Sequence, residues 1–222
     1  MLATQLTGTR ALRHSEETNR RDSGSVCCGE FSGDLEDYAS VRSQMDMMDL
    51  LNSDPLSRNA QISLCGTYRY KLTRSWGSGP SLTFIMFNPS TADGLRDDQT
   101  IRRCMYFAKR EGYSGITVVN LYAYRTTFPV DLVARFVEGV DVVGPRNQRS
   151  ILESLNDARQ VVLAWGGMSF KGLSGHPQVI RECISSIPDG IEILCLGTTK
   201  DGAPRHPSRL GNDVALVPYK LA

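Results

Sequence analysis

Apolar runs alternate with amphipathic stretches along most of the chain beyond residue 66. Residues 66–76 alternate polar with apolar positions, as a strand with one buried face does. Four later runs are continuously apolar, which is typical of short strands buried on both faces. The stretches between these runs carry helix start and stop signals, such as Asp97 or Asp98 as N-cap and Gly112 as the end of one helix. We therefore expect buried strands at 81–87, 115–122, 160–166 and 191–197, and helices at 97–112, 129–136, 146–159 and 174–187.

Strands that alternate with helices predict an α/β fold. Four apolar strands separated by helices call for a mostly parallel sheet that is covered on both faces. Ligands of such sheets bind beyond the carboxyl ends of the strands. The residues that follow each predicted strand are therefore the first candidates for a site.

Polar and turn-forming residues do cluster at these four positions. Asn88 follows the first apolar run, Asn120 lies within the second, and Trp165 and a glycine pair end the third. The fourth run leads into "GAPRHPSRLG", residues 202–211, where His206 stands between two prolines. Asn88 could start an Asx turn, His206 could be a surface histidine, and Trp165 could pack in the core. A buried Asn120 must find partners in the backbone or in a ligand, because an unpaired amide costs about 1 to 3 kcal/mol.

Residues 1–55 differ in composition from the rest of the chain. They hold five arginines and ten acidic residues, a net charge of −5, which leaves +6 for the remainder. Their low apolar content predicts an acidic leader that is disordered or loosely packed, with a short helix at 38–51. We assign the folded domain to 56–222, whose mild positive charge suits a polyanionic partner.

Composition limits the classes of protein that come into question. No apolar run approaches the roughly 20 residues of a membrane span, so we expect no membrane partner. The amino-terminal residues lack the apolar stretch of a secretion signal, which predicts a cytoplasmic protein. The six cysteines show no C-x-x-C pair or metal-ligand rhythm, so we expect reduced thiols, no metal and no cofactor. We also expect a monomer.

Four segments resemble the motifs of the uracil-DNA glycosylase superfamily. "FIMFNPS" resembles the first active-site motif, and "GITVVNLYAYR" resembles the strand whose asparagine reads the base. "VVLAWGGMSFKG" resembles the third core strand, and "RHPSRL" resembles the His-Pro-Ser-x-Leu loop. The resemblance covers roughly residues 82–212. It implies a three-layer α/β/α fold with a central four-stranded parallel sheet in the order 2-1-3-4, to which residues 66–76 add an N-terminal hairpin or edge strand.

The sequence also resembles an uncharacterised bacterial and phage domain family. This second resemblance is carried by the "NPSTAD" stretch, by a D-x-T-I-R-R-C pattern and by N-L-x-A-x-R. It implies no particular reaction.

The first resemblance leads to the hypothesis of a monofunctional DNA glycosylase. His206 would stabilise the negative charge on the departing base, and Asn88 would orient the attacking water. Asp93 is a further candidate as general base. Asn120, with Pro89 and Ser90, would contact the base after it has rotated out of the stack. We find no lysine placed for Schiff-base chemistry, so we expect no strand cleavage.

The loop at 202–211 has the residues that a base-flipping loop needs. Leu210 matches the leucine that wedges into the duplex, and Pro204 and Pro207 would stiffen its support. The DNA-binding set that we predict combines this loop with the end of the second strand: Arg205, Ser208, Arg209, Leu210 and Arg125. A basic helix at 97–110 could contact phosphates or simply be a solvated face.

Ser90 departs from the uracil-specific pattern. That branch has a bulky tyrosine at the matching position, which closes the pocket against substituents at the 5-position of the pyrimidine. Ser90 therefore predicts a roomier pocket for a modified or damaged pyrimidine, unless another side chain fills the space. Base repair and defence against modified phage DNA would use the same chemistry.

Two other functions stay open: a hydrolase of nucleotides or nucleosides, and a module that binds a modified base without cleaving it.

Overall fold

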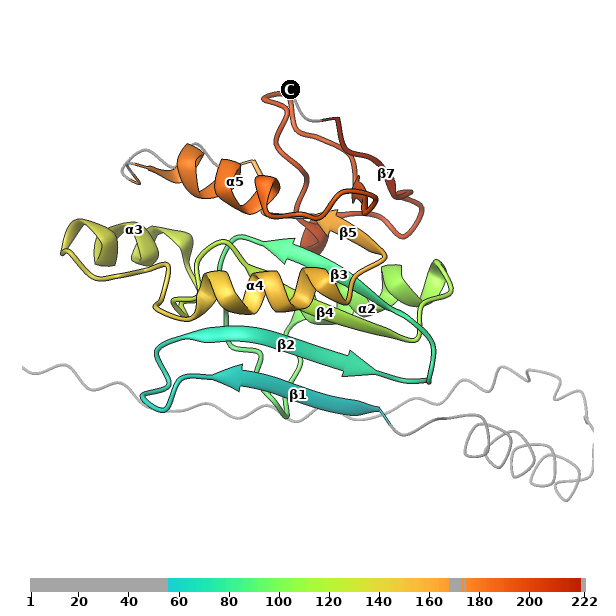
Figure 1. Ribbon diagram of the computed structural model, residues 1–222, viewed down its shortest axis with the longest axis horizontal. Helices are drawn as coiled ribbons and strands as arrows, with labels where there is room; N and C mark the ends of the chain where they lie inside the picture. The colour runs from blue at the N-terminus through green and yellow to red at the C-terminus, as the bar shows by residue number, and fades with distance from the viewer. Residues whose placement is uncertain (1–55, 168–172, 174, 221–222) are drawn as a thin grey trace, which may run out of the picture. The chain divides into compact units, whose positions relative to one another are not determined.

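The computed structural model describes residues 56–167, 173 and 175–220, and in this region the strands form a seven-stranded mixed sheet. The strand order across the sheet is β1-β2-β4-β3-β5-β6-β7 (Figure 1). The strands are β1 (Ser57–Ile62), β2 (Arg69–Ser75), β3 (Ser81–Met86), β4 (Gly115–Asn120), β5 (Gln160–Leu163), β6 (Glu192–Cys195) and β7 (Val217–Pro218). The helices are α2 (Gln99–Arg110), α3 (Pro129–Val137), α4 (Asn147–Asn156) and α5 (His176–Ser185), and a 3₁₀ turn, η1, spans Pro207–Arg209.

The expected α/β class is confirmed, but the sheet has seven strands, more than the expected four parallel strands with one N-terminal hairpin or edge strand. Strand β3 pairs in parallel with β4 on one side and β5 on the other, and β5 pairs in parallel with β6. An antiparallel hairpin of β1 and β2 extends the sheet beyond β4, and β7 adds a short antiparallel strand beyond β6. All four parallel strands therefore end at one edge of the sheet, where β2 begins.

Side chains of alternate residues on the central strands pack into two separate hydrophobic cores, one on each face of the sheet. On β3, Phe84 packs in one core and Ile85 in the other. The first core lies against Ile101 and Cys104 of α2. The second lies against Ile151 of α4, so α2 and α4 cover opposite faces of the sheet (Figure 1). Burial on both faces is the reason why these strands read as unbroken apolar runs.

The capping residue of α2 also fixes the chain beside the cavity described below. The Oδ1 of Asp98 accepts from the backbone N–H of Ile101 at 2.9 Å, as an N-cap carboxylate does. Gly112 follows the helix with φ 79°, a left-handed conformation that glycine adopts without strain. These two residues set the limits of the helix close to those expected at 97–112.

Other expectations have mixed outcomes. All four predicted helices are present; α2, α4 and α5 are shorter than expected, and α3 extends one residue further than expected. Strand β1 was not predicted from its polar sequence. The expected leader at 1–55 and its helix at 38–51 lie outside the described residues. Within the described part of the chain, no helix is long and apolar enough to cross a membrane. Cys104, Cys183 and Cys195 are buried free thiols, and Cys65 is an exposed one.

Candidate functional site

A cavity of about 810 Å³ lies at the carboxyl edge of the parallel strands. It is lined by residues from the ends of β3, β4 and β5, from the start of β2 and α2, and from the loop after β6. This volume falls within the range of small-molecule sites, roughly 300 to 1,000 Å³. The cavity therefore lies where the topology of the sheet predicts a ligand.

Most of the site residues predicted from the sequence line this one cavity. Asn88, Asn120 and His206, which come from three distant segments, all contribute to its wall. The other predicted residues on its wall are Ser90, Arg205, Ser208, Arg209 and Leu210. Pro89, Asp93 and Arg125 are not among the lining residues.

Asn88 is held by the backbone on both sides. Its Nδ2 donates to the carbonyl of Pro89 at 3.1 Å and to the carbonyl of Thr126 at 2.8 Å. Both amide hydrogens are then used, which leaves Oδ1 as the only side-chain group that can meet a ligand. Pro89 is buried behind it and its carbonyl also accepts from the N–H of Thr126, so Pro89 supports the wall without lining it.

Asn120 ends β4 as a buried amide, 1% exposed. Its Oδ1 accepts from Nη2 of Arg69 at 3.2 Å. Its backbone carbonyl accepts from Nδ2 of Asn147 at 2.9 Å, and the carbonyl of Leu121 accepts from the same atom at 3.1 Å. The end of the strand is therefore fixed by side chains from two other elements.

His206 is bound in one tautomer. Its Nδ1 accepts from the backbone N–H of Ser208 at 3.3 Å and lies 2.9 Å from the Oγ of the same residue. A nitrogen that accepts an N–H carries no proton, so the neutral ring carries its hydrogen on Nε2. Burial lowers the pKa of His206 below its usual value, so the ring is neutral at neutral pH.

The loop that carries His206 is tied to the end of β5. The N–H of Gly166 donates to the carbonyl of Pro204 at 2.8 Å, and the N–H of Arg205 donates to the carbonyl of Gly197 at 2.9 Å. Gly166 has φ 87°, and a Cβ added there would lie 3.4 Å from the Cβ of His206. The left-handed backbone is what favours glycine here, because a Cβ would make only an ordinary contact with His206.

Two arginines of α2 hold the chain after Leu210. Nη2 of Arg103 donates to the carbonyl of Leu210 at 2.7 Å. Nη1 of Arg110 donates to the carbonyls of Asn212 at 2.8 Å and Val214 at 2.7 Å. In the described structure these two cations of the basic helix support the loop.

Asp93 and Arg125 lie away from the cavity wall. The Oδ1 of Asp93 accepts from the N–H groups of Leu95 and Arg96, both at 2.8 Å, which closes a turn and lowers the pKa of the carboxyl. Nη1 of Arg125 donates to the carbonyl of Gly66 at 3.2 Å. Asp93 and Arg125 were predicted as site residues, but the structure does not place them on the cavity wall with the others.

Sequence reasoning missed two charged residues of the wall. Arg69, at the start of β2, lines the cavity and is only 3% exposed. Asp98, which we had considered only as a helix cap, also lines it. The antiparallel direction of β2 was the signal for Arg69, because an antiparallel strand begins at the edge where parallel strands end.

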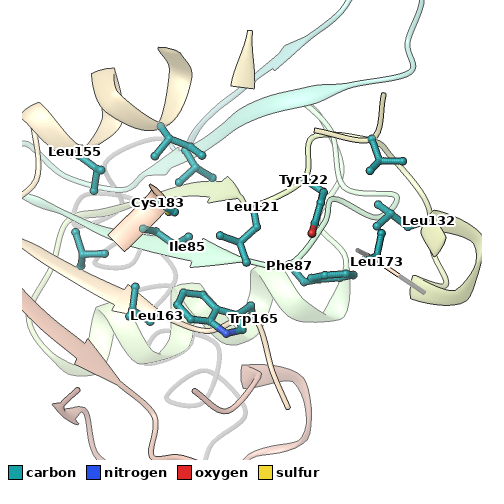
Figure 2. Close-up of a cluster of buried hydrophobic side chains, with 14 residues drawn as sticks. Ile85, Phe87, Leu121, Tyr122, Leu132, Leu155, Leu163, Trp165, Leu173 and Cys183 are labelled. Atoms are coloured by element: carbon teal, nitrogen blue, oxygen red, sulfur yellow. The ribbon is translucent and has the colours of Figure 1, made fainter. Parts of the chain in front are cut away.

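Aromatic side chains form the apolar part of the wall. Phe87 and Trp165 line the cavity and belong to the core cluster shown in Figure 2. The ring of Phe87 meets that of Tyr122 edge to face, with centroids 5.2 Å apart. Trp165 therefore both packs in the core, as one alternative held, and faces the cavity.

Among the described residues, no group of three or more His, Cys, Asp or Glu side chains is placed to hold a metal ion.

Comparison with known proteins gives one result. A search of curated proteins and a search of solved structures found no match. A family profile matches residues 69–208, more than half of the chain. This segment runs from β2 to η1 and includes all of the cavity wall except Arg209 and Leu210. The chain belongs to the family described as "Protein of unknown function (DUF1643)".

Proposed function

We propose that this protein hydrolyses the N-glycosidic bond of a pyrimidine flipped out of DNA and leaves an abasic site. One observation carries the proposal: Asn88, Asn120 and the neutral His206 line a single cavity at the carboxyl edge of the sheet. Two amides and one imidazole are the kinds of group that read a base edge and stabilise a departing anion. The protein would act as a cytoplasmic monomer.

The arrangement of the strands supports a glycosylase-like fold. The four parallel strands lie in the order β4-β3-β5-β6, which is 2-1-3-4 when they are numbered along the chain. Residues with the expected chemistry lie at the end of β4 and after β3 and β6. The β1-β2 hairpin and β7 are additions at the two sides of this unit.

His206 would stabilise the leaving base. Its Nε2–H is free of the bonds that occupy Nδ1, and it can donate to an oxygen that becomes negative as the bond breaks. A neutral donor serves this purpose without the cost of burying a charge.

Asn88 would position the water. Its Nδ2 is engaged by two backbone carbonyls, so Oδ1 can accept a hydrogen from a water molecule and hold it. An amide oxygen does not take up the proton, as a carboxylate would. Asp98 lines the same cavity and is the carboxylate available there, in place of Asp93.

The rim of the cavity suits DNA. Arg205 and Arg209 are exposed and line the cavity, where they can contact phosphates on either side of the flipped nucleotide. Leu210 is half-buried in the same loop and is available to fill the gap left in the duplex.

The test is incubation with DNA duplexes that carry natural and altered pyrimidines, followed by treatment with alkali to reveal abasic sites. We expect cleavage at one class of altered base. The rate should fall at least about a hundredfold in His206→Ala, by analogy with the removal of an oxyanion donor, and should also fall in Asn88→Ala, which loses the group that positions the water. Arg149→Ala is the matched control because it removes an exposed charge from α4. Unchanged rates in both site variants would overturn the assignment.

A second function, binding a modified base without cleavage, is favoured by one observation. Both hydrogens of the Asn88 amide serve the backbone, as they would in a purely supporting role. In that case the duplex panel would give tight, base-dependent binding and no abasic sites.

A further inference from the structure

Arg69 is a buried cation on the wall of the cavity. Its Nη1 donates to the carbonyl of Ala92 at 3.0 Å and its Nη2 donates to Oδ1 of Asn120 at 3.2 Å. Its Nε is buried and has no hydrogen-bond partner among the described residues. Burial lowers the pKa of Arg69 to about 10, so the side chain keeps its charge at neutral pH. Nη1 and Nη2 each carry a second hydrogen beyond these bonds, so Arg69 keeps N–H groups for a ligand of the cavity that it lines.

Arg69 also decides which way the Asn120 amide faces. A guanidinium has only donors, so the atom that meets it must be the amide oxygen. The opposite orientation would set the amide N–H groups against the N–H groups of the arginine. Nδ2 of Asn120 is therefore turned away from Arg69, and no acceptor for it is found among the residues that the structure describes. The free side-chain groups that Asn120 offers are two N–H donors.

Three residues of the cavity wall offer donors to a ligand. Arg69 contributes a charged N–H, Asn120 contributes amide N–H groups, and His206 contributes Nε2–H. Acceptors on the wall include Oδ1 of Asn88 and the carboxylate of Asp98, whose Oδ1 also caps α2, and the hydroxyl of Thr199 can donate or accept. A ligand that fits this pattern has an edge of acceptors and a separate donor.

We propose that Arg69 and Asn120 together read a pyrimidine of the cytosine class, one whose N3 carries no proton. This rests on the proposed function only in that the ligand is a nucleobase. In cytosine, N3 and O2 are neighbouring acceptors and the 4-amino group is a donor. In uracil and thymine, N3 carries a hydrogen, which would meet the donors of Asn120 and Arg69. The mismatch leaves buried donors without partners, so we expect the uracil class to bind at least about tenfold more weakly.

The experiment measures binding without cleavage. Oligonucleotides carry one 2′-fluoro nucleotide, because fluorine at C2′ disfavours the cationic sugar and keeps the base attached. The bases form two pairs matched at the 5-position: cytosine with uracil, and 5-methylcytosine with thymine. Dissociation constants come from fluorescence anisotropy. We expect the cytosine member of each pair to bind at least about tenfold more tightly. Equal binding, tighter binding of the uracil member, or no base-dependent binding would overturn the proposal.

A variant tests whether Arg69 causes the preference. Arg69→Met frees the amide to turn over, so the ratio within each pair should fall to about threefold or less. Arg149→Met is the matched control on α4 and should keep the wild-type ratio. If Arg69→Met does not fold, as circular dichroism would show, the ratios of the wild-type protein still decide the question.

The same sequences with ordinary deoxynucleotides separate this proposal from the proposed function. Formation of abasic sites with a preference for uracil would retain the glycosylase and reject the reading by Arg69 and Asn120. A cytosine preference in binding without abasic sites would retain the reading by Arg69 and Asn120 and reject the glycosylase.

Discussion

His206 is held by residues of its own loop. Its backbone φ of −77° and ψ of 138° are extended, and its ring accepts the N–H of Ser208 two residues later. This local bond selects the tautomer, and burial keeps the ring neutral. Pro204 and Pro207 flank His206 in the sequence. Both prolines are buried, so they anchor the loop on the domain.

The depressed pKa of His206 predicts a dependence of stability on pH. The unfolded chain takes up a proton near the usual histidine pKa of about 6.5, while the folded protein does so only at lower pH. The free energy of unfolding should therefore fall as the pH falls below about 6.5. His176, whose pKa is also lowered by burial, adds to the effect.

Urea unfolding at pH 7.5 and 5.5 measures this loss. His206→Asn removes the titrating group, so the variant should lose less stability between the two pH values than the wild-type protein. An equal loss in both proteins would show that His206 does not titrate below its usual range.

Ser90 sets a prediction about the shape of the cavity. The Ser90→Tyr variant should lose at least about tenfold in the release of 5-substituted pyrimidines relative to unsubstituted ones, because a ring would occupy the space near the 5-position. Competition between two labelled duplexes in one tube measures the ratio directly. A ratio that stays at the wild-type value would mean that Ser90 does not face the 5-position.

At the scale of elements, Arg74 on β2 organises the chain between β3 and α2. It is fully buried, and its Nε lies 2.6 Å from Oδ1 of Asp97. Its Nη2 donates to the carbonyl of Asp93 at 2.6 Å. Because Asp98 caps α2 directly after this segment, Arg74 helps to place one wall of the cavity.

Removal of Arg74 should therefore be costly. We expect Arg74→Met to lower the free energy of unfolding by about 3 kcal/mol, since the largely buried carboxylate of Asp97 loses its close partner and keeps only the partly exposed Arg58. Arg58→Met is the matched control, because Arg58 lies 3.6 Å from the same carboxylate but is 39% exposed. It should cost less than about 1 kcal/mol. Equal effects in urea unfolding would contradict this view of the segment.

The elements that could be predicted from the sequence are those with a strong local signal. Strands β3 and β4 are buried on both faces, and their apolar runs identified them. Strand β1 has a polar, mostly exposed sequence and is a strand because it pairs with β2. Arg69 begins an antiparallel strand, so the rule for the ends of parallel strands does not point to it, and the capping role of Asp98 gives no sign that it also lines a cavity.

On the scale of the whole molecule, the cavity has charged residues on its exposed rim. Arg205 and Arg209 are exposed beside Leu210, on a loop that α2 holds through Arg103. The site thus depends on a C-terminal segment that docks on a helix from the first half of the domain. The family profile covers the β2-to-η1 region in which most of this assembly lies.

Salt dependence tests the charged rim. Each phosphate contact contributes about 0.9 to the slope of log K against log salt concentration on duplex DNA. Arg209→Ala should therefore reduce the slope by about that amount, while Arg149→Ala should leave it unchanged. Identical slopes for the wild-type protein and Arg209→Ala would remove this residue from the DNA interface.

The most direct test of the central claim is mass spectrometry of the products after incubation with modified duplex DNA. The wild-type protein should yield free base and abasic DNA in equal amounts, and His206→Ala should yield almost none in the same time. Intact DNA with the wild-type protein, or equal release by His206→Ala, would contradict the account.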